Sequence, residues 1–339
     1  MRRQLLVAEL WVGLASIAVC LTGCHGGGAA LVAAPSHVDT AQDGLRGDLN
    51  GNGAPDVSDA IGILRIVIGL DAHNPLADSD GDGVVGVADA ILLLRCAVGL
   101  DDWPIPGSGD PGYKTTGADG QTLVWVPSGS FMMGGTVFPH EQPIHEVTIE
   151  GFWIGQCEVT NAQYQVFCTA TGRTFPLGSD QGDDHPVVDV SWDDAKAYCD
   201  HYGYALPTEA QWEYAARGPA SSAYPWGDAW DLSRCCNYDN KGPGGRTYPV
   251  GSFPTGVSWC GALDMAGNVW EWCADWYSAT YYEISPALNP PGPDTGACRV
   301  VRGGAWNYYY YYCRTASRDA YYPTTALNYY GFRVSRGPL

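Results

Sequence analysis

The chain has 339 residues, 45% of them hydrophobic and 12% aromatic, which is enough for two or three domains with apolar cores. Its 37 acidic residues outnumber the 18 basic ones and give a formal charge of -19 at pH 7. Because so acidic a chain repels the phosphate backbone of nucleic acids, we expect no nucleic-acid partner.

The chain begins with a segment typical of protein export. Arg2 and Arg3 precede an apolar stretch, and small residues precede Cys24. The letters LTGC resemble a bacterial lipobox, whose cysteine becomes the lipidated first residue of the mature protein. We therefore predict a lipoprotein signal over 1–24, a tether over 25–45, and a membrane lipid anchor on Cys24 at the bacterial outer membrane or cell surface. A plain cleaved signal is the alternative.

An internal duplication follows the tether. Residues 48–71 recur thirty positions later, and each copy has oxygen-bearing side chains at positions 1, 3, 5 and 12 of a loop with glycine at position 6. Ca²⁺ prefers six to eight oxygen ligands, which alternate residues of a tight loop can supply. An acidic solvated turn is the alternative to a metal site. We predict calcium ligands from these side chains and from the carbonyls at position 7: Asp48, Asn50, Asn52, Ala54, Asp59, Asp78, Asp80, Asp82, Val84 and Asp89.

An apolar segment follows each loop, at 61–70 and 91–100, and its Gly-Leu-Asp ending predicts a short helix. The pair resembles a type I dockerin, a calcium-dependent module that docks onto the cohesin domains of a scaffold protein. The resemblance implies a small all-α module over 46–102 and a cohesin-type partner. The positions that the family uses for partner selectivity indicate an apolar patch on that partner: Val57, Ser58, Val87 and Ala88.

A linker and a larger domain complete the chain. Residues 103–118 are rich in Pro and Gly and lack periodicity, which is typical of a linker. Residues 119–339 are rich in Trp and Gly, with short strand-like runs and few helical signals. This pattern predicts an α+β domain with much loop.

Two helices of this domain have clear start signals. Ser191 is followed three residues later by Asp194, and Thr208 by Gln211, which is the spacing of a capping box. Gly218 is a stop signal for the second helix. We therefore predict helices that begin after Ser191 and after Thr208.

Motifs of one family recur in order over nearly the whole domain: VPSGSFMMGG, EVTNAQY, LPTEAQWEYAARG, LDMAGNVWEWCADWY, VRGGAW and GFRVSR. In these motifs the domain resembles the formylglycine-generating enzyme, or sulfatase-modifying factor, family. The resemblance implies an elaborated C-type lectin fold. It does not by itself imply the activity, because one fold supports many functions.

The family's oxidases use two cysteines in the last segment as a copper site, which suits the softness of Cu(I). Here Tyr308 stands where the first of these cysteines is expected, and Cys313 stands where ordinary members have an apolar residue. We therefore predict no catalytic residue and favour a binding protein over an oxidase, and we interpret Cys313 as a core or disulfide cysteine.

The resemblance also implies a calcium site. In the family a calcium ion is held around the motif that here spans LDMAGNVWE. Two carboxylates and two backbone carbonyls are suitable ligands for this cation. Loop capping by the two carboxylates is the alternative. The corresponding residues are Asp264, Gly267, Val269 and Glu271.

Nine cysteines lie in the last domain, and an exported chain can form disulfides. Because nine is odd, at least one remains unpaired within the chain. The sequence leaves the connectivity open. The nine are Cys157, Cys168, Cys199, Cys235, Cys236, Cys260, Cys273, Cys298 and Cys313.

The segment 307–330 is unusually rich in tyrosine and includes five in succession. In this it resembles the variable proteins of diversity-generating retroelements, in which mutation of AAY codons yields Tyr, Asp, Thr, Ser, Ala or Leu at ligand-binding positions. Tyrosine suits such surfaces because its rigid amphipathic ring costs little entropy to order. The candidate positions are Asn307, Tyr308, Tyr309, Tyr310, Tyr311, Tyr312, Ser317, Asp319, Ala320, Tyr321, Tyr322, Thr324, Thr325, Leu327, Asn328, Tyr329 and Tyr330.

Together these features predict a surface-anchored protein that binds an unidentified protein or glycan ligand through a diversified tyrosine-rich site. Calcium is the predicted cofactor, and a cohesin domain is the predicted assembly partner. One alternative is a fixed accessory or carbohydrate-associated binding protein of a cohesin–dockerin complex. The other is a formylglycine-generating oxidase.

Overall fold

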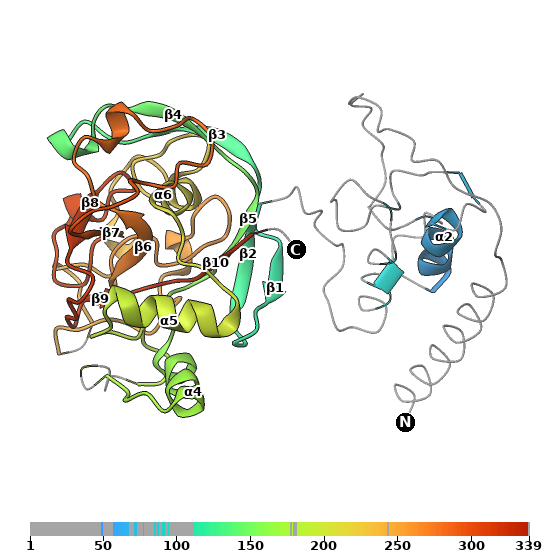
Figure 1. Cartoon of the computed structure of the whole chain (residues 1–339), viewed down its shortest axis with the longest axis horizontal. Helices are drawn as coiled ribbons and strands as arrows, with labels where there is room; N and C mark the ends of the chain where they lie inside the picture. The colour runs from blue at the N-terminus through green and yellow to red at the C-terminus, as the bar shows by residue number, and fades with distance from the viewer. Residues whose placement is uncertain are drawn as a thin grey trace. The chain divides into compact units, whose positions relative to one another are not determined.

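The computed structural model describes residues 111–337 except 177, 179–181 and 243, together with residues 57–67 and a few isolated residues between 49 and 94. The chain divides into two compact units, Met1–Gly107 and Ser108–Leu339, which are described separately (Figure 1). Within the described residues, no helix has the length and apolar character needed to cross a membrane.

The first unit contains helix α2 (Val57–Val67). The helix begins four residues before the predicted start at 61, and its first turn contains Asp59, where a carboxylate is favourable near the positive end of the helix dipole. The carboxylate of Asp59 is buried and accepts a hydrogen bond of 3.0 Å from the backbone N–H of Leu49. Asp59 therefore ties the helix to the preceding loop.

Three sheets form the framework of the second unit (Figure 1). The first has four antiparallel strands, in the order β1 (Lys114–Thr116), β2 (Thr122–Val126), β5 (Phe152–Gly155) and β10 (Ser335–Arg336). The second pairs β3 (Gly129–Met133) with β4 (His145–Ile149). The third has the order β8 (Arg318–Tyr321), β7 (Arg299–Arg302), β6 (Trp270–Trp276) and β9 (Tyr330–Gly331).

Two details of these sheets differ from a simple antiparallel arrangement or from the prediction. Residues 114–116 were predicted to belong to the linker 103–118, but they form strand β1 and pair with β2. Strand β9 is parallel to β6, whereas β7 and β8 are antiparallel to their neighbours. Residues 302–333, which we call the last segment of the chain, therefore contribute strands to both edges of the third sheet.

Among its described residues the second unit has three α-helices, α4 (Asn161–Thr171), α5 (Trp192–Tyr202) and α6 (Glu209–Arg217). The predicted capping boxes at Ser191 and Thr208 are confirmed as the starts of α5 and α6. The sequence pattern did not predict α4, although Thr160 and Gln163 form the same kind of box. Short 3₁₀ turns are η2 (Pro139–Glu141), η3 (Leu232–Arg234), η4 (Pro254–Gly256), η5 (Tyr281–Glu283) and η6 (Tyr310–Tyr312).

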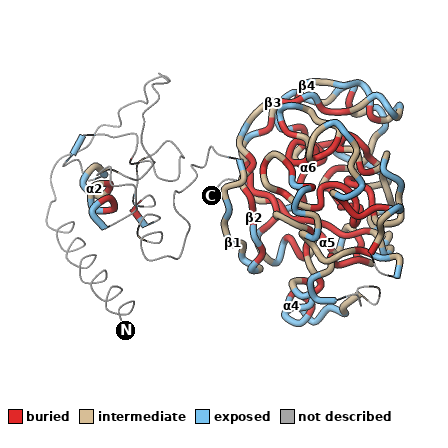
Figure 2. Tube along the Cα trace, turned by 180° about the vertical axis from the view of Figure 1, so that it is seen from behind, coloured by how far each residue is buried: buried red, intermediate tan, exposed pale blue. Residues whose placement is uncertain are grey.

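Buried residues fill the interior of the second unit (Figure 2). One cluster joins α4 and α5 to β6 around Trp270 and Trp272, which are fully buried. A second cluster joins α6 to strands β2 to β5 around Trp212. The mixture of helices and sheets around these clusters confirms the predicted α+β class.

Four arginines of the last segment bind buried carboxylates. Helix α6 supplies Glu209 and Glu213, four residues apart and so on one face, and both carboxylates are buried. The paired carboxylates raise the pKa of Arg302, Arg318 and Arg333 although burial opposes this shift. The contacts are Arg302 with Glu213 and with Glu209 (3.4 Å), Arg318 with Glu209 (2.6 Å), Arg333 with Glu271 (2.6 Å) and Arg314 with Glu141 (2.7 Å).

We expect the Arg333→Ala variant to lose about 3–5 kcal/mol of unfolding free energy, because Glu271 then remains as a buried charge without its counter-ion. Arg173→Ala is the matched control, since its ion pair with Asp194 is exposed and such a pair contributes about 0–1 kcal/mol. Urea denaturation measures both values. Equal losses in the two variants would contradict the role assigned to Arg333.

Candidate functional site

Burial separates the residues of the last segment into two groups. The residues around the arginine contacts are buried, including Gly303, Gly304, Cys313, Phe332 and Arg333, and we call these the frame. Most candidate variable positions between them are at least partly exposed, and we call these the tyrosine surface: Asn307, Tyr308, Tyr309, Tyr310, Tyr311, Tyr312, Asp319, Ala320, Tyr321, Tyr322, Thr324, Thr325, Leu327, Asn328 and Tyr329.

Two candidate positions belong instead to the buried part. The exposed fraction is 1% for Ser317 and 0% for Tyr330. Ser317 directly precedes the buried Arg318, and Tyr330 pairs with Trp270 in the third sheet. A ligand therefore cannot contact these two residues in this conformation. Their residue types did not distinguish them from the exposed positions.

The tyrosine run forms a turn with two faces. Tyr308 and Tyr312 are four residues apart and both lie edge-on to Trp270, at centroid distances of 5.4 and 6.2 Å. Tyr309 and Tyr310 point outward and are 45% and 46% exposed. Gly304 has φ +77°, and a Cβ there would lie 2.9 Å from the carbonyl oxygen of Tyr312, so the frame requires glycine beneath this turn.

Aromatic residues from elsewhere in the chain extend the tyrosine surface. Tyr238 lies 4.6 Å from Tyr309 between ring centroids, and Trp230 lies 5.5 Å from Tyr310. The amino group of Lys241 sits 4.1 Å above the ring of Tyr238. The sequence analysis did not assign these three residues to the site, because nothing in their local pattern marks them as neighbours of residues 309–310.

A cluster of tyrosine hydroxyls and one carboxylate lies beside the turn. The rings of Tyr308 and Tyr329 lie 5.7 Å apart between centroids, and burial and the neighbouring Tyr321 raise the pKa of both residues. Burial also raises the pKa of Asp319. The N–H of Ala320 donates a hydrogen bond of 2.8 Å to this carboxylate and opposes the shift. At neutral pH this part of the surface therefore offers neutral phenols, which can both donate and accept hydrogen bonds.

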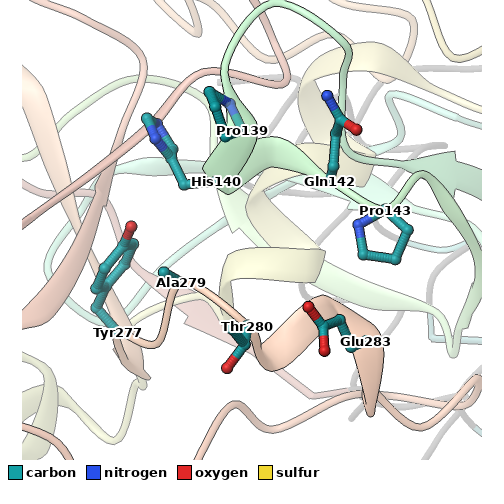
Figure 3. A pocket seen from close by; sticks show the side chains of 8 residues that line it. All are labelled: Pro139, His140, Gln142, Pro143, Tyr277, Ala279, Thr280 and Glu283. Atoms are coloured by element: carbon teal, nitrogen blue, oxygen red, sulfur yellow. The ribbon is translucent and has the colours of Figure 1, made fainter.

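A hollow of about 690 Å³ lies between η2 and the segment leading into η5 (Figure 3). Its titratable side chains are those of His140, Tyr277 and Glu283, and His140 and Glu283 lie on opposite sides. The imidazole Nε2 of His140 lies 3.1 Å from the carbonyl oxygen of Arg318 and donates to it. The hollow thus borders the frame, and its described lining contains no position of the tyrosine surface.

The structure brings part of the second predicted calcium set into the core. Asp264 and Glu271 are buried, and Asp264 accepts a hydrogen bond of 2.6 Å from the N–H of Gly251. Both oxygens of Glu271 are occupied, at 2.6 and 2.7 Å from the guanidinium of Arg333 and 2.7 Å from the indole N–H of Trp212.

These carboxylates do not form an open ligand set. A guanidinium cation already neutralises Glu271, so Ca²⁺ would have to compete with Arg333. Within the described part of the chain, no three His, Cys, Asp or Glu side chains are grouped to hold a metal ion. The set of Asp264, Gly267, Val269 and Glu271 stays a prediction, and the contacts of Glu271 do not favour it.

Most of the first predicted calcium set lies outside the described residues, namely Asp48, Asn50, Asn52, Ala54, Asp78, Asp80, Asp82, Val84 and Asp89. Cys24 and Ala88 lie outside them as well. Asp59 is described, and its burial beside the start of α2 is compatible with a ligand at the end of a loop. Val57 and Val87 are 42% and 53% exposed, as a docking surface requires.

The residues at the oxidase positions have different environments. Tyr308 is half-buried in the hydroxyl cluster, and Cys313 is fully buried. Cys313 packs against Cys235 and Ala266 in a small apolar cluster. This arrangement agrees with the interpretation of Cys313 as a core or disulfide cysteine.

The fold and the surface define a mixed α+β domain of the C-type-lectin-like class that carries a partly exposed, tyrosine-rich C-terminal segment on a buried frame. Residues 109–338 match the family described as "Sulfatase-modifying factor enzyme 1-like domain". The chain therefore belongs to this family, as the sequence motifs predicted.

One curated protein and two solved structures illustrate what this domain is similar to. A formylglycine-generating enzyme of Streptomyces coelicolor is 36% identical over 279 residues, which cover 62% of this chain and 88% of the relative. The structure of PvdO from Pseudomonas aeruginosa aligns with a TM-score of 0.58 at 28% identity, over 68% of this chain and 99% of that one. Treponema denticola variable protein 1 aligns with a TM-score of 0.56 at 24% identity, over 64% and 95%, and so shares the fold.

We expect substitutions to separate the tyrosine surface from the frame. Thr324→Ala and Tyr322→Ala should each change the unfolding free energy by no more than about 0.5 kcal/mol, because both side chains are exposed. Tyr330→Ala should cost about 3–5 kcal/mol, because it empties a fully buried site. Urea denaturation of the three variants is the measurement. Similar losses at all three positions would contradict the division.

Proposed function

We propose that this protein is a lipid-anchored receptor of the bacterial cell envelope that binds its ligand through a diversified tyrosine surface. Its N-terminal module docks, in the presence of calcium, onto a cohesin-type domain of a scaffold. The ligand is a protein or a glycan, and the C-terminal unit acts as a binding domain rather than as an enzyme.

One observation carries this proposal. The positions that AAY codons can diversify are at least partly exposed except for Ser317 and Tyr330, whereas the residues between them are anchored by buried arginine–carboxylate contacts. Such a division allows side chains to change without loss of the fold. The fold shared with Treponema denticola variable protein 1, a protein named for its variability, supports the same conclusion.

Sequencing of the locus in many cells tests the diversification. We expect variation at codons of the tyrosine surface, the fewest changes at Ser317 and Tyr330, and none in the frame. A template repeat that differs at adenines should lie near a reverse transcriptase gene. An invariant segment without a template would contradict diversification.

An invariant segment would favour the second candidate, a fixed binding protein of a cohesin–dockerin complex. The exposed rings of Tyr309, Tyr310 and Tyr238 favour a sugar as the ligand in that case, because aromatic faces offer an apolar platform with polar edges. Binding to a glycan array, with the Tyr309→Ala variant as control, would support it. Binding of one Cu(I) per chain and activity on a sulfatase peptide would instead support the oxidase named among the relatives.

The proposed docking module has support from its exposed apolar residues. Val57 and Ile61 lie four residues apart on α2, and Val87 and Ile91 repeat them thirty positions later. All four are at least 42% exposed. Two equivalent apolar stripes are therefore available to an apolar partner surface.

We expect calcium to be required for this docking. Addition of a chelator should lower the helical circular-dichroism signal of the full chain, and Asp78→Ala with Asp89→Ala should abolish capture by a panel of cohesin domains. Asp71→Ala is the control, because Asp71 forms an exposed ion pair with Arg65 and is not a predicted ligand. Capture by the double variant, measured by surface plasmon resonance, would contradict the proposal.

A further inference from the structure

The cysteines of the second unit have distinct surroundings. Most of the buried thiols donate to single oxygen atoms, such as Cys168 to the carbonyl of Thr174 and Cys260 to that of Ala215. Cys235 and Cys313 differ, because they lie together in one small cluster of buried residues. Both are at least 98% buried and pack together with Ala266, and Trp226 and Trp230 pack against this cluster.

The two cysteines join segments that are far apart in the sequence. Cys235 directly follows η3, and Cys313 directly follows η6, which contains the outward-pointing Tyr310. The N–H of Tyr238 donates to the carbonyl oxygen of Tyr308 at 2.9 Å, so the same two segments also meet at the tyrosine surface. A bond between the two cysteines would fix both sides of that surface.

We propose that Cys235 and Cys313 form a disulfide bond that holds the backbone of the tyrosine surface while its side chains vary. The two thiols lose two protons and two electrons, a sulfur–sulfur bond forms, and a disulfide-bearing oxidant of the export compartment is reduced to a dithiol. The inference rests on the proposed export of the chain.

The variable nature of the surface explains why a fixed bond is needed there. Ring contacts hold the turn in this sequence, including Tyr309 with Tyr238 and Tyr310 with Trp230. Tyr309 and Tyr310 are themselves candidate variable positions, so their contacts disappear when they change. Cys313 belongs to the frame, and a disulfide at that position constrains the turn whatever residues precede it.

The surroundings favour a structural bond over a redox switch. The neighbouring thiol of Cys313 and burial both raise the pKa of the Cys235 thiol. Exchange requires an exposed thiolate, so the pair is unreactive once the unit has folded. The bond therefore forms during folding, before Trp226 and Trp230 cover the cluster.

Peptide mapping of the full chain, exported to a bacterial periplasm and alkylated in denaturant without reductant, tests the bond. We expect tryptic peptide 235–241 to be joined to peptide 303–314. Because Cys236 shares the first peptide, the Cys236→Ser variant assigns the bond to Cys235. Recovery of Cys235 and Cys313 as alkylated thiols from the folded, exported chain would overturn the inference, as would a bond from either one to another cysteine.

Thermal unfolding provides a second measurement. Cys235→Ala and Cys313→Ala should each lower the melting temperature. The double variant should have about the same melting temperature as each single variant, because either change removes the same bond. Cys199→Ala combined with Cys313→Ala is the matched control, and there the two shifts should add, since Cys199 lies in another buried cluster. Additive shifts for Cys235 and Cys313 would overturn the inference.

The outcome is independent of the diversification test. A chain with a variable locus but free thiols at both positions would overturn the disulfide and leave the proposed receptor intact. A chain with the disulfide and an invariant locus would overturn diversification alone.

Discussion

The arginine–carboxylate contacts of the last segment are the constraint on which the rest of the domain depends. Removal of one partner would leave the other as a buried charge, which is strongly destabilising. Helix α6, strand β6 and turn η2 each supply a carboxylate to this segment. The path of residues 302–333 is therefore fixed by groups outside the tyrosine surface.

A segment fixed in this way can present changing side chains. Tyr309 and Tyr310 project from a turn whose backbone rests on Gly304 and is bordered by Cys313 and Arg314. Exposed rings with polar edges contribute contact area at a small entropic cost when they bind. In the proposed receptor the same frame supports both folding and recognition, and the two requirements fall on different residues.

The family relationship illustrates how one fold serves different sites. The domain is 36% identical over 279 residues to a formylglycine-generating enzyme, and Tyr308 is predicted to stand where the oxidases have a cysteine. Hydroxyl groups of a tyrosine cluster are poor ligands for Cu(I), which prefers soft sulfur. In the proposed function, change at a few surface positions separates a binding protein from an enzyme on the same scaffold.

The sequence by itself determined the family, the α+β class and the starts of α5 and α6, because motifs and capping boxes depend on short spacings. It also marked residues 307–330 as the candidate site. Only the tertiary structure decided that Ser317 and Tyr330 are buried, that Tyr238 and Trp230 join the surface, and that Cys235 meets Cys313. These features depend on contacts between residues distant in the chain, which no local pattern encodes.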